Sequence, residues 1–178
     1  MMGKQISIRQ FVESDANEVS ALFIKVSRLL APAALKEAFE VYIRRSQDEE
    51  IDRILAYYGV RGGGFWVATI EASIVGMFGL EPSGEHAMEL RRMYVNPDWR
   101  RRGIAGKMLT FAEDYCRAND ALHLDLSTSE LQSEALSFYR QSGYAPVREE
   151  VAEAANNKTI GGGVRRYHFK KILSGRSE

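Results

Sequence analysis

The sequence has 178 residues, of which 45% are hydrophobic and 27% charged, and these values are ordinary for a globular domain. Lysine and arginine together number 24, as do aspartate and glutamate, so a net charge of zero gives no electrostatic case for nucleic-acid or membrane binding. The single cysteine excludes an intramolecular disulfide, and no apolar run approaches the roughly 18 residues of a membrane span. We therefore expect a soluble, cytoplasmic protein that binds neither nucleic acid nor membrane.

Apolar residues alternate with polar ones in short runs, as in half-buried strands, and recur at three- and four-residue steps in longer runs, as in helices. Ile6 and Ile8 illustrate the first pattern, and Val19, Leu22 and Phe23 illustrate the second. In chain order we expect a strand at 6–11, a helix at 17–30, a helical region at 32–58 that can be broken near Ser46, strands at 65–70 and 74–80, a turn at 82–84, a strand at 89–95, a helix at 103–119, a strand at 122–126, a helix at 132–142, and strands at 147–151 and 164–169.

The stretch from Glu89 to Leu109, ELRRMYVNPDWRRRGIAGKML, reads as a strand, a turn and a helix start. Small residues at Gly103 and Gly106 leave the first backbone N–H groups of this helix uncrowded, and the helix dipole adds positive charge at the same place. Three arginines, at 100–102, precede the helix. The stretch therefore predicts a binding site for a phosphate-bearing ligand.

Two common phosphate motifs do not fit the spacing of this stretch. A Walker A loop ends in Gly-Lys-Ser/Thr, but Lys107 is followed by Met108, and Arg101 stands where the first glycine of that motif is required. A dinucleotide fingerprint requires G-x-G-x-x-G early in a βαβ unit, and the sequence meets neither condition. The remaining pattern is Arg100-x-x-Gly103-x-Ala105.

This pattern resembles the Gln/Arg-x-x-Gly-x-Gly/Ala signature of the GNAT superfamily of acyl-CoA-dependent N-acetyltransferases. A second segment, Ala135-x-x-x-Tyr139-x-x-x-Gly143-Tyr144, is similar to a later segment of the same family, and the order of the expected elements resembles the family over essentially the whole chain. The resemblance implies a single domain, residues 1–178, with an α+β fold. This fold has three αβα layers around a central mixed, mostly antiparallel sheet of about seven strands, with the early helices bordering the acceptor cleft.

The resemblance also implies that acetyl-CoA is the acetyl donor. In the family, the main chain of the strand before the loop pairs with the pantetheine arm, and the corresponding residues here are Met93, Tyr94 and Val95. The loop and the helix start bind the pyrophosphate in the family, and the corresponding residues here are Arg100, Arg101, Arg102, Gly103, Ile104, Ala105 and Gly106. Many members carry an asparagine that contacts the cofactor three residues before the alanine of the second segment, and Gln132 takes that position here.

Acetyl transfer to an amine needs a base for the amine and a proton for the departing thiolate. The resemblance assigns these roles to Glu89 as general base and Tyr139 as general acid. Simple strand alternation would place Glu89, Arg91, Met93 and Val95 on one face. Glu89 can instead be a surface ion-pair partner of Arg91 or Arg92, and Tyr139 can instead be a core tyrosine.

Other residues leave alternatives open. Trp99 can flank the adenine or pack on its own loop, and Cys116 falls on an apolar helix face that favours a small hydrophobe over a nucleophile. The three histidines lack partners at metal spacing, so we expect no metal. The resemblance implies that the acceptor is a primary amine of a small molecule, amino acid or peptide, which attacks acetyl-CoA directly in a ternary complex. Homodimers are common among proteins with this fold. The alternative to an enzyme is a CoA-binding sensor or regulatory module without efficient catalysis.

Overall fold

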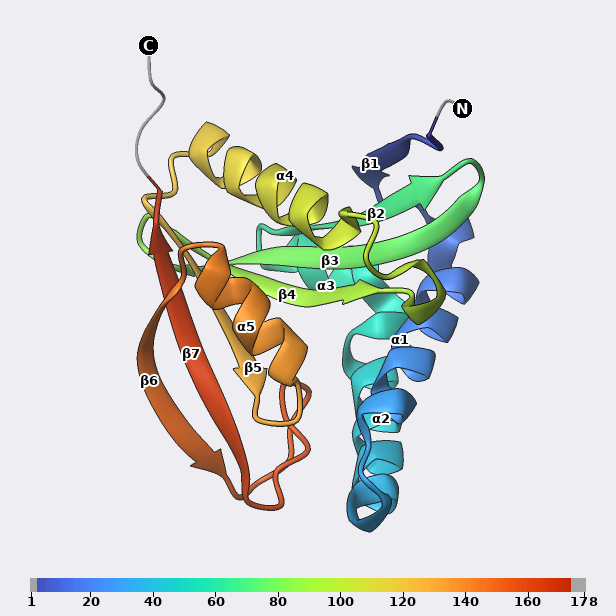
Figure 1. The fold of residues 1–178 in the computed structure, drawn as a ribbon, viewed down its shortest axis with the longest axis vertical. Coiled ribbons are helices and arrows are strands. Elements are labelled where there is room, and N and C mark those ends of the chain that lie inside the picture. The colour runs from blue at the N-terminus through green and yellow to red at the C-terminus, as the bar shows by residue number, and fades with distance from the viewer. Residues whose placement is uncertain (1–2, 174–178) are drawn as a thin grey trace.

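The computed structural model describes residues 3–173, whose strands form one seven-stranded sheet in the order β1-β2-β3-β4-β5-β7-β6 (Figure 1). β4 pairs with β5 in parallel, and the other neighbouring strands pair antiparallel. The strands are β1 (Ile6–Gln10), β2 (Gly64–Ile70), β3 (Ser73–Gly84), β4 (Ala87–Val95), β5 (His123–Ser129), β6 (Ala145–Ala152) and β7 (Val164–Ile172). The predicted mixed, mostly antiparallel sheet is confirmed.

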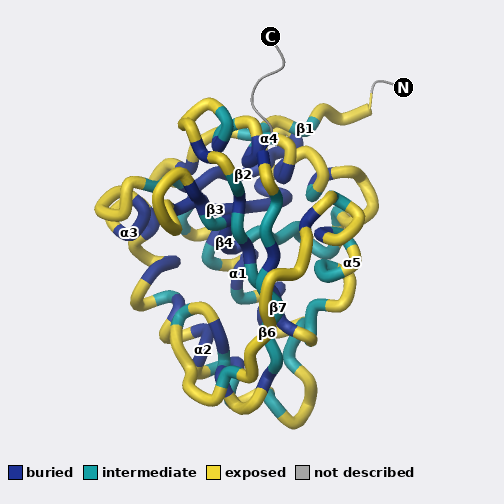
Figure 2. The backbone as a smooth tube through the Cα atoms, turned by 90° about the vertical axis from the view of Figure 1, so that its left-hand side faces the viewer, coloured by how far each residue is buried: buried dark blue, intermediate teal, exposed yellow. Residues whose placement is uncertain are grey.

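Helices cover both faces of this sheet, as Figure 1 shows. α4 (Ile104–Ala118) and α5 (Ser133–Gln141) pack on one face over a core that includes Phe78 and Met108. α1 (Ala16–Leu30), α2 (Lys36–Glu49) and α3 (Ile54–Val60) pack on the other face over a second core that includes Phe23 and Met77. The buried backbone is concentrated in the central strands between these helices (Figure 2). The predicted three-layer αβα architecture is therefore confirmed.

The second helical region breaks four residues later than the sequence suggested. Ser46 is buried within α2, and the helix ends at Glu49, after which Glu50 adopts a non-helical backbone conformation. A short 3₁₀ turn, Ile51–Arg53, leads into α3. The break places the Glu50 carboxylate in the protein interior, where it is fully buried. The sequence pattern predicted a capping box at Ser46. The helix instead ends at Glu49, and the carboxylate of the next residue, Glu50, points into the protein interior.

The β3–β4 hairpin also differs from the prediction. β3 continues through Pro82, Ser83 and Gly84, where we expected the turn, and Pro82 pairs with Met88. The chain reverses one step later, where His86 has a φ of +55°. A proline at this position is compatible with pairing because it lies next to the turn, where the register between the two strands is irregular. The hairpin brings Glu81 directly opposite Glu89.

A bulge in β4 divides the centre of the sheet. Tyr94 pairs with Met77 and Arg91 with Gly79, so two residues of β4, Arg92 and Met93, face a single residue of β3. Arg92 has a φ of +54°, a left-handed conformation that is uncommon outside glycine. Pairing between β4 and β5 ends at Leu90 and Leu126, so beyond this point the edge of β4 that faces β5 has no strand partner.

Candidate active site

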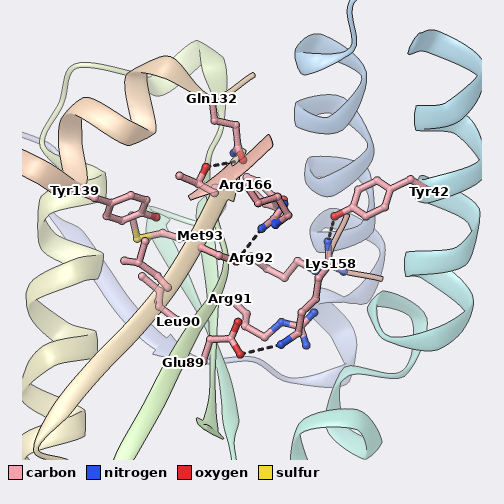
Figure 3. Close-up of a pocket in the computed structure, with 14 residues that line it drawn as sticks. Tyr42, Glu89, Leu90, Arg91, Arg92, Met93, Gln132, Tyr139, Lys158 and Arg166 are labelled. Atoms are coloured by element: carbon pink, nitrogen blue, oxygen red, sulfur yellow. Dashed lines mark hydrogen bonds and ion pairs between the residues drawn. The ribbon is translucent and has the colours of Figure 1, made fainter. Parts of the chain in front are cut away.

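The gap between β4 and β5 is the centre of the candidate site. Because pairing stops at Leu90, the main chain of Met93, Tyr94 and Val95 keeps one edge free to bind another extended group. A cavity opens at this gap, lined by Tyr42, Glu89, Leu90, Arg91, Arg92, Met93, Tyr94, Leu126, Ser127, Thr128, Gln132, Tyr139, Lys158 and Arg166 (Figure 3). The cavity therefore joins the predicted base, the predicted acid and three of the predicted cofactor-binding positions.

A buried ion-pair network supports the bulge. The Glu50 carboxylate accepts hydrogen bonds from Arg91 Nη2 at 3.0 Å and from Arg92 Nη2 at 2.7 Å, and the Tyr58 hydroxyl donates to it at 2.6 Å. Arg91 also donates to Glu81 Oε1 at 3.1 Å, and Arg92 donates to the Tyr42 hydroxyl at 2.6 Å. Both arginines are thus held in place by buried partners, which argues against either of them as a pyrophosphate ligand. We call Glu50, Arg91 and Arg92 the bulge network.

The bulge reverses the expected alternation of β4. Met93 and Val95 pack against the core beneath α4 and α5, whereas Tyr94 packs against the core of α1 to α3. Arg91 and Arg92 are consecutive residues, yet both donate to Glu50, which lies between α2 and α3. Their side chains therefore lie on the same face, so the alternation of the strand is interrupted between them. The prediction that Glu89 shares a face with Met93 and Val95 is therefore wrong. An inserted residue shifts every side chain after it to the opposite face.

Glu89 lies on the side of the cavity nearest α1 to α3, where it contacts a residue that the sequence did not single out. Lys158 Nζ lies 2.8 Å from Glu89 Oε2 (Figure 3). It also lies 3.6 Å from Glu81 Oε1. Lys158 belongs to the connection between β6 and β7, and Arg92 donates to the backbone carbonyl of the preceding Asn157. The partner of Glu89 is thus Lys158, whereas Arg91 and Arg92, the expected partners, are engaged with Glu50.

Tyr139 reaches the cavity from α5, on the opposite side of the sheet from Glu89. Its side chain points toward Met93 (Figure 3), and its ring packs edge-on against Tyr144 at 5.8 Å between centroids. Burial raises the pKa of the Tyr139 phenol, so the group keeps its proton at neutral pH. A protonated phenol at the gap has the form that a general acid requires.

The loop before α4 has the backbone geometry of an anion site. Gly103 has a φ of +75° and immediately precedes the helix, and the Lys107 N–H donates to the Gly103 carbonyl at 3.1 Å. The N–H groups of the preceding helical residues, 104–106, are then free of the helix ladder and point outward. A Cβ atom added at Gly103 or Gly106 would meet no atom of a neighbouring segment within 4 Å, so the space beside the helix start is open.

The other predicted loop residues differ in their surroundings. Arg100 lies 3.7 Å from exposed Glu134, Arg101 is exposed, and the Arg102 guanidinium lies 4.7 Å from the centre of the Trp99 ring. Trp99 therefore packs on its own loop. The side chain of Ile104 is buried in the core, so its N–H alone can face a ligand, and Ala105 is half-buried.

Gln132 lies in the connection between β5 and α5, directly before the first residue of α5. Its side-chain oxygen accepts a hydrogen bond from the Thr128 hydroxyl at 2.7 Å. This bond orients the amide nitrogen, which is the part of the side chain that remains available on the wall of the cavity. α5 begins one residue later, at Ser133, so Gln132 is its N-cap.

Three functional candidates were missed by sequence reasoning: Glu50, Lys158 and Arg166. Glu50 lies in a polar run, QDEEI, where nothing distinguishes a buried carboxylate from a solvated one. Lys158 lies in a polar loop, and Arg166 lies in a strand that is rich in basic residues. Their positions depend on contacts between segments far apart in the chain. Information on which distant residues contact one another would therefore have been needed to find them.

Within residues 3–173, no group of three histidine, cysteine or carboxylate side chains is arranged to hold a metal ion. Cys116 is buried in α4, and burial raises the pKa of its thiol to about 12. The prediction of a small buried hydrophobe at this position is confirmed. The helices of residues 3–173 include none with the length and apolar character needed to cross a membrane.

Solved acetyltransferases share this fold. A GNAT-family acetyltransferase from Staphylococcus aureus Mu50 matches with a TM-score of 0.74 at 19% identity, over 96% of this chain and 100% of that chain. PaiA N-acetyltransferase from Thermoplasma acidophilum, solved in complex with coenzyme A, matches with a TM-score of 0.70 at 21% identity, over 94% and 99% of the two chains. The fold class is thus that of the GNAT acetyltransferases.

The sequence comparisons lead to the same family. The acetyltransferase (GNAT) domain family matches residues 61–146, and probable N-acetyltransferase 14 of Xenopus tropicalis is 31% identical over 97 residues, which are 53% of this chain and 47% of that protein. The chain spans about half the length of the curated relatives that it matches. Residues 61–146 thus match the GNAT acetyltransferase domain family, and the fold of the described residues is that of GNAT acetyltransferases.

Proposed function

We propose that this chain transfers the acetyl group of acetyl-CoA to a primary amine of a small molecule, amino acid or peptide, by direct attack in a ternary complex. The observation that carries the proposal is the gap between β4 and β5, where Glu89 and Tyr139 line one cavity from opposite faces of the sheet. The base then lies on the side of the acceptor and the acid on the side of the departing sulfur. The coenzyme A complex of the Thermoplasma relative supports the choice of donor.

The chain's own groups suit the parts of acetyl-CoA. The pyrophosphate would bind the free N–H groups at the start of α4, next to the open space at Gly103 and Gly106, with Arg100 or Arg101 adding charge. The pantetheine arm would pair with the free edge of β4 at Met93 to Val95. Acetyl-CoA supplies an activated acyl group as a thioester.

Three steps are then assigned to residues. Glu89, directly or through water, accepts a proton from the acceptor ammonium and leaves a neutral amine. The free main-chain N–H groups of β4 donate to the carbonyl oxygen as it gains negative charge. Tyr139 donates its proton to the thiolate as the carbon–sulfur bond breaks, and it is reprotonated from solvent.

Leucine in place of Gly106 is expected to weaken acetyl-CoA binding by at least about tenfold while leaving the fold intact. Gly106 lies in the first turn of α4, where an added Cβ meets no atom of a neighbouring segment within 4 Å and a larger side chain would occupy the proposed pyrophosphate space. Leucine also favours helix over glycine by roughly 0.5–1 kcal/mol, so the melting temperature should not fall. Titration calorimetry with acetyl-CoA would measure the affinity.

The matched control is Gly59→Leu. Gly59 lies in α3, also with no protein atom within 4 Å of an added Cβ, and far along the chain from the α4 loop. This variant should bind acetyl-CoA as the wild type does. If the Gly106→Leu variant and the wild type bind acetyl-CoA with equal affinity, the pyrophosphate does not bind at the start of α4.

The activity itself is tested by incubating the protein with acetyl-CoA and a panel of primary amines while following free thiol. We expect thiol release that depends on the amine. The ion pair between Lys158 and Glu89 favours a second candidate, a CoA-binding sensor, because the proposed base is already engaged. For a sensor, Glu89→Gln and Tyr139→Phe would leave the biological activity intact, whereas Gly106→Leu would abolish it.

A further inference from the structure

Lys158 brings a primary ammonium to the proposed base. Its Nζ lies 2.8 Å from Glu89 and 3.6 Å from Glu81, at the wall of the cavity that also contains Tyr139. The side chain is 41% exposed, so it is not part of the buried bulge network and can leave without exposing a core. A protonated acceptor amine presents the same group to the same carboxylates. Lys158 therefore marks the position of the acceptor ammonium.

Arg166, on β7, is a second charge at this cavity, and its surroundings differ from those of the other arginines. Its guanidinium donates to the Ser127 hydroxyl at 2.8 Å, and no carboxylate of residues 3–173 lies within 4 Å of it. Arg91 and Arg92, in contrast, are both paired with Glu50. Burial lowers the pKa of Arg166, as expected for a guanidinium removed from water without a counter-ion. An anion beside it would restore this lost stabilisation.

One of the cationic side chains that line the cavity has no carboxylate partner. Arg91 and Arg92 pair with Glu50 and Lys158 pairs with Glu89, whereas no carboxylate of residues 3–173 lies within 4 Å of Arg166. When an acceptor ammonium replaces that of Lys158 at Glu89, Arg166 still lacks a carboxylate partner. A ligand that carries one negative charge in addition to its ammonium matches the cavity, whereas a simple amine leaves it unmatched.

The strand register places the two charges on one face at a short separation. Glu89 pairs with Asp125, and Ser127, the anchor of Arg166, lies one strand across and two residues along on the same face. Strand geometry gives a separation of about 8 Å between the Cα atoms of Glu89 and Ser127. The Glu89 carboxylate and the Arg166 guanidinium can therefore contact the two ends of one small molecule, each through a charge-assisted hydrogen bond.

We propose that the acceptor is a small primary amine that carries a carboxylate, of which an α-amino acid is the simplest case. Its ammonium replaces that of Lys158 at Glu89, and its carboxylate pairs with Arg166. A second cavity shares Glu89, Ser127, Lys158 and Arg166 with the first and continues along β5, β6 and β7, which leaves room for the rest of the acceptor. This inference rests on the proposed acetyltransferase function.

The reaction balances with these groups. The ammonium gives one proton to Glu89, the neutral nitrogen forms a bond to the acetyl carbon, and the carbon–sulfur bond breaks. The nitrogen then loses a second proton, the thiolate gains one through Tyr139, and one proton is released to solvent overall. The product is an N-acetyl carboxylate without the ammonium charge, so its attraction to Glu89 is lost and release is favoured.

The test compares carboxylate-bearing acceptors with their decarboxylated forms. Leucine, phenylalanine and glutamate would be assayed beside isoamylamine, phenethylamine and 4-aminobutyrate, and beside leucinamide, by thiol release with acetyl-CoA. We expect kcat/KM to be about 10–100-fold higher for leucine or phenylalanine than for the matching amine or amide, as for a charged hydrogen bond. Arg166→Met should reduce the leucine-to-isoamylamine ratio by a similar factor, with kcat/KM for leucine falling most.

Arg165→Met is the matched control, because Arg165 pairs with Glu149 at 2.8 Å and does not line either cavity. It should leave the ratio unchanged. Lys158→Met should lower the KM for leucine, since the tethered ammonium no longer competes. Thiol release that is equal with leucine and isoamylamine would overturn this inference while leaving the acetyltransferase intact. Release with none of the amines would overturn the proposed function as well.

Discussion

Replacing Glu50 by glutamine is expected to lower the free energy of unfolding by about 3–5 kcal/mol. Glu50 is fully buried and is the shared counter-ion of Arg91 and Arg92, which are themselves buried. A neutral amide would leave Arg92 buried without a carboxylate partner and Arg91 with Glu81 as its remaining one. Arg92 also has a left-handed backbone, whose strain costs on the order of 1–3 kcal/mol and persists only while its surroundings hold it.

Urea denaturation followed by circular dichroism would measure this loss, with Glu49→Gln as the matched control. Glu49 is the preceding residue, half exposed, and its carboxylate lies 3.5 Å from exposed Arg45. Such a surface pair contributes about 0–1 kcal/mol, so the control should unfold close to the wild-type midpoint. A Glu50→Gln variant as stable as Glu49→Gln would show that the bulge does not depend on this carboxylate.

The effect of Glu50→Gln should depend on pH. Burial alone would raise the pKa of Glu50, but Arg92, Arg91 and Tyr58 outweigh burial and lower it. A lowered folded-state pKa contributes stability that is present above the unfolded glutamate value of about 4.3 and is lost as the pH falls through the folded value. Urea midpoints between pH 3 and pH 7 should therefore converge for wild type and variant at the acid end. A difference that stays constant over this range would contradict the assignment.

Phenylalanine in place of Tyr139 is expected to lower kcat by about 10²–10⁴-fold, the range for loss of a general acid. The side chain is otherwise well suited to substitution, because its ring packs among Phe138, Tyr144 and the core, and the ring is retained. Acetyl-CoA affinity should change little, since no binding role is assigned to the hydroxyl. Steady-state thiol release at saturating acetyl-CoA would measure kcat.

Tyr115→Phe provides the comparison for Tyr139→Phe. Tyr115 is a half-buried tyrosine on α4 that packs edge-on against Trp66 and does not line the cavity. The Tyr115→Phe variant, which loses only this hydroxyl, should have the same kcat as the wild type. If Tyr139→Phe behaves as Tyr115→Phe does, Tyr139 is a core residue, and the proton for the sulfur comes from elsewhere.

The layers and the α4 loop could be predicted because their signals are local. Periodicity identified the elements, and the spacing of Arg100, Gly103 and Ala105 identified a helix start with free N–H groups. These features depend on residues adjacent in the chain. The order of these elements along the chain, which resembled that of the family, is confirmed by the structure.

The acceptor side of the site could not be predicted because it depends on long-range contacts. The phase change of β4 arises from a bulge at Arg92, and no proline or glycine signals it in the sequence. The bulge is held by Glu50, some 40 residues earlier in the chain, and its loop contact is made by Asn157, which is 65 residues later. The pairing of Glu89 with Lys158 has the same origin, at a separation of 69 residues. Local propensity carries no information on such pairs.

The most direct test of the proposed mechanism is a mass-spectrometric measurement of acetylated amine formed by the wild type and by the Glu89→Gln/Tyr139→Phe double variant. Both proteins would be supplied with acetyl-CoA at concentrations shown by calorimetry to saturate them. We predict one acetylated amine for each thiol released by the wild type, and a product rate lower by at least about 10²-fold in the double variant. Equal product rates in the two proteins, or thiol release by the wild type without acetylated amine, would contradict the account.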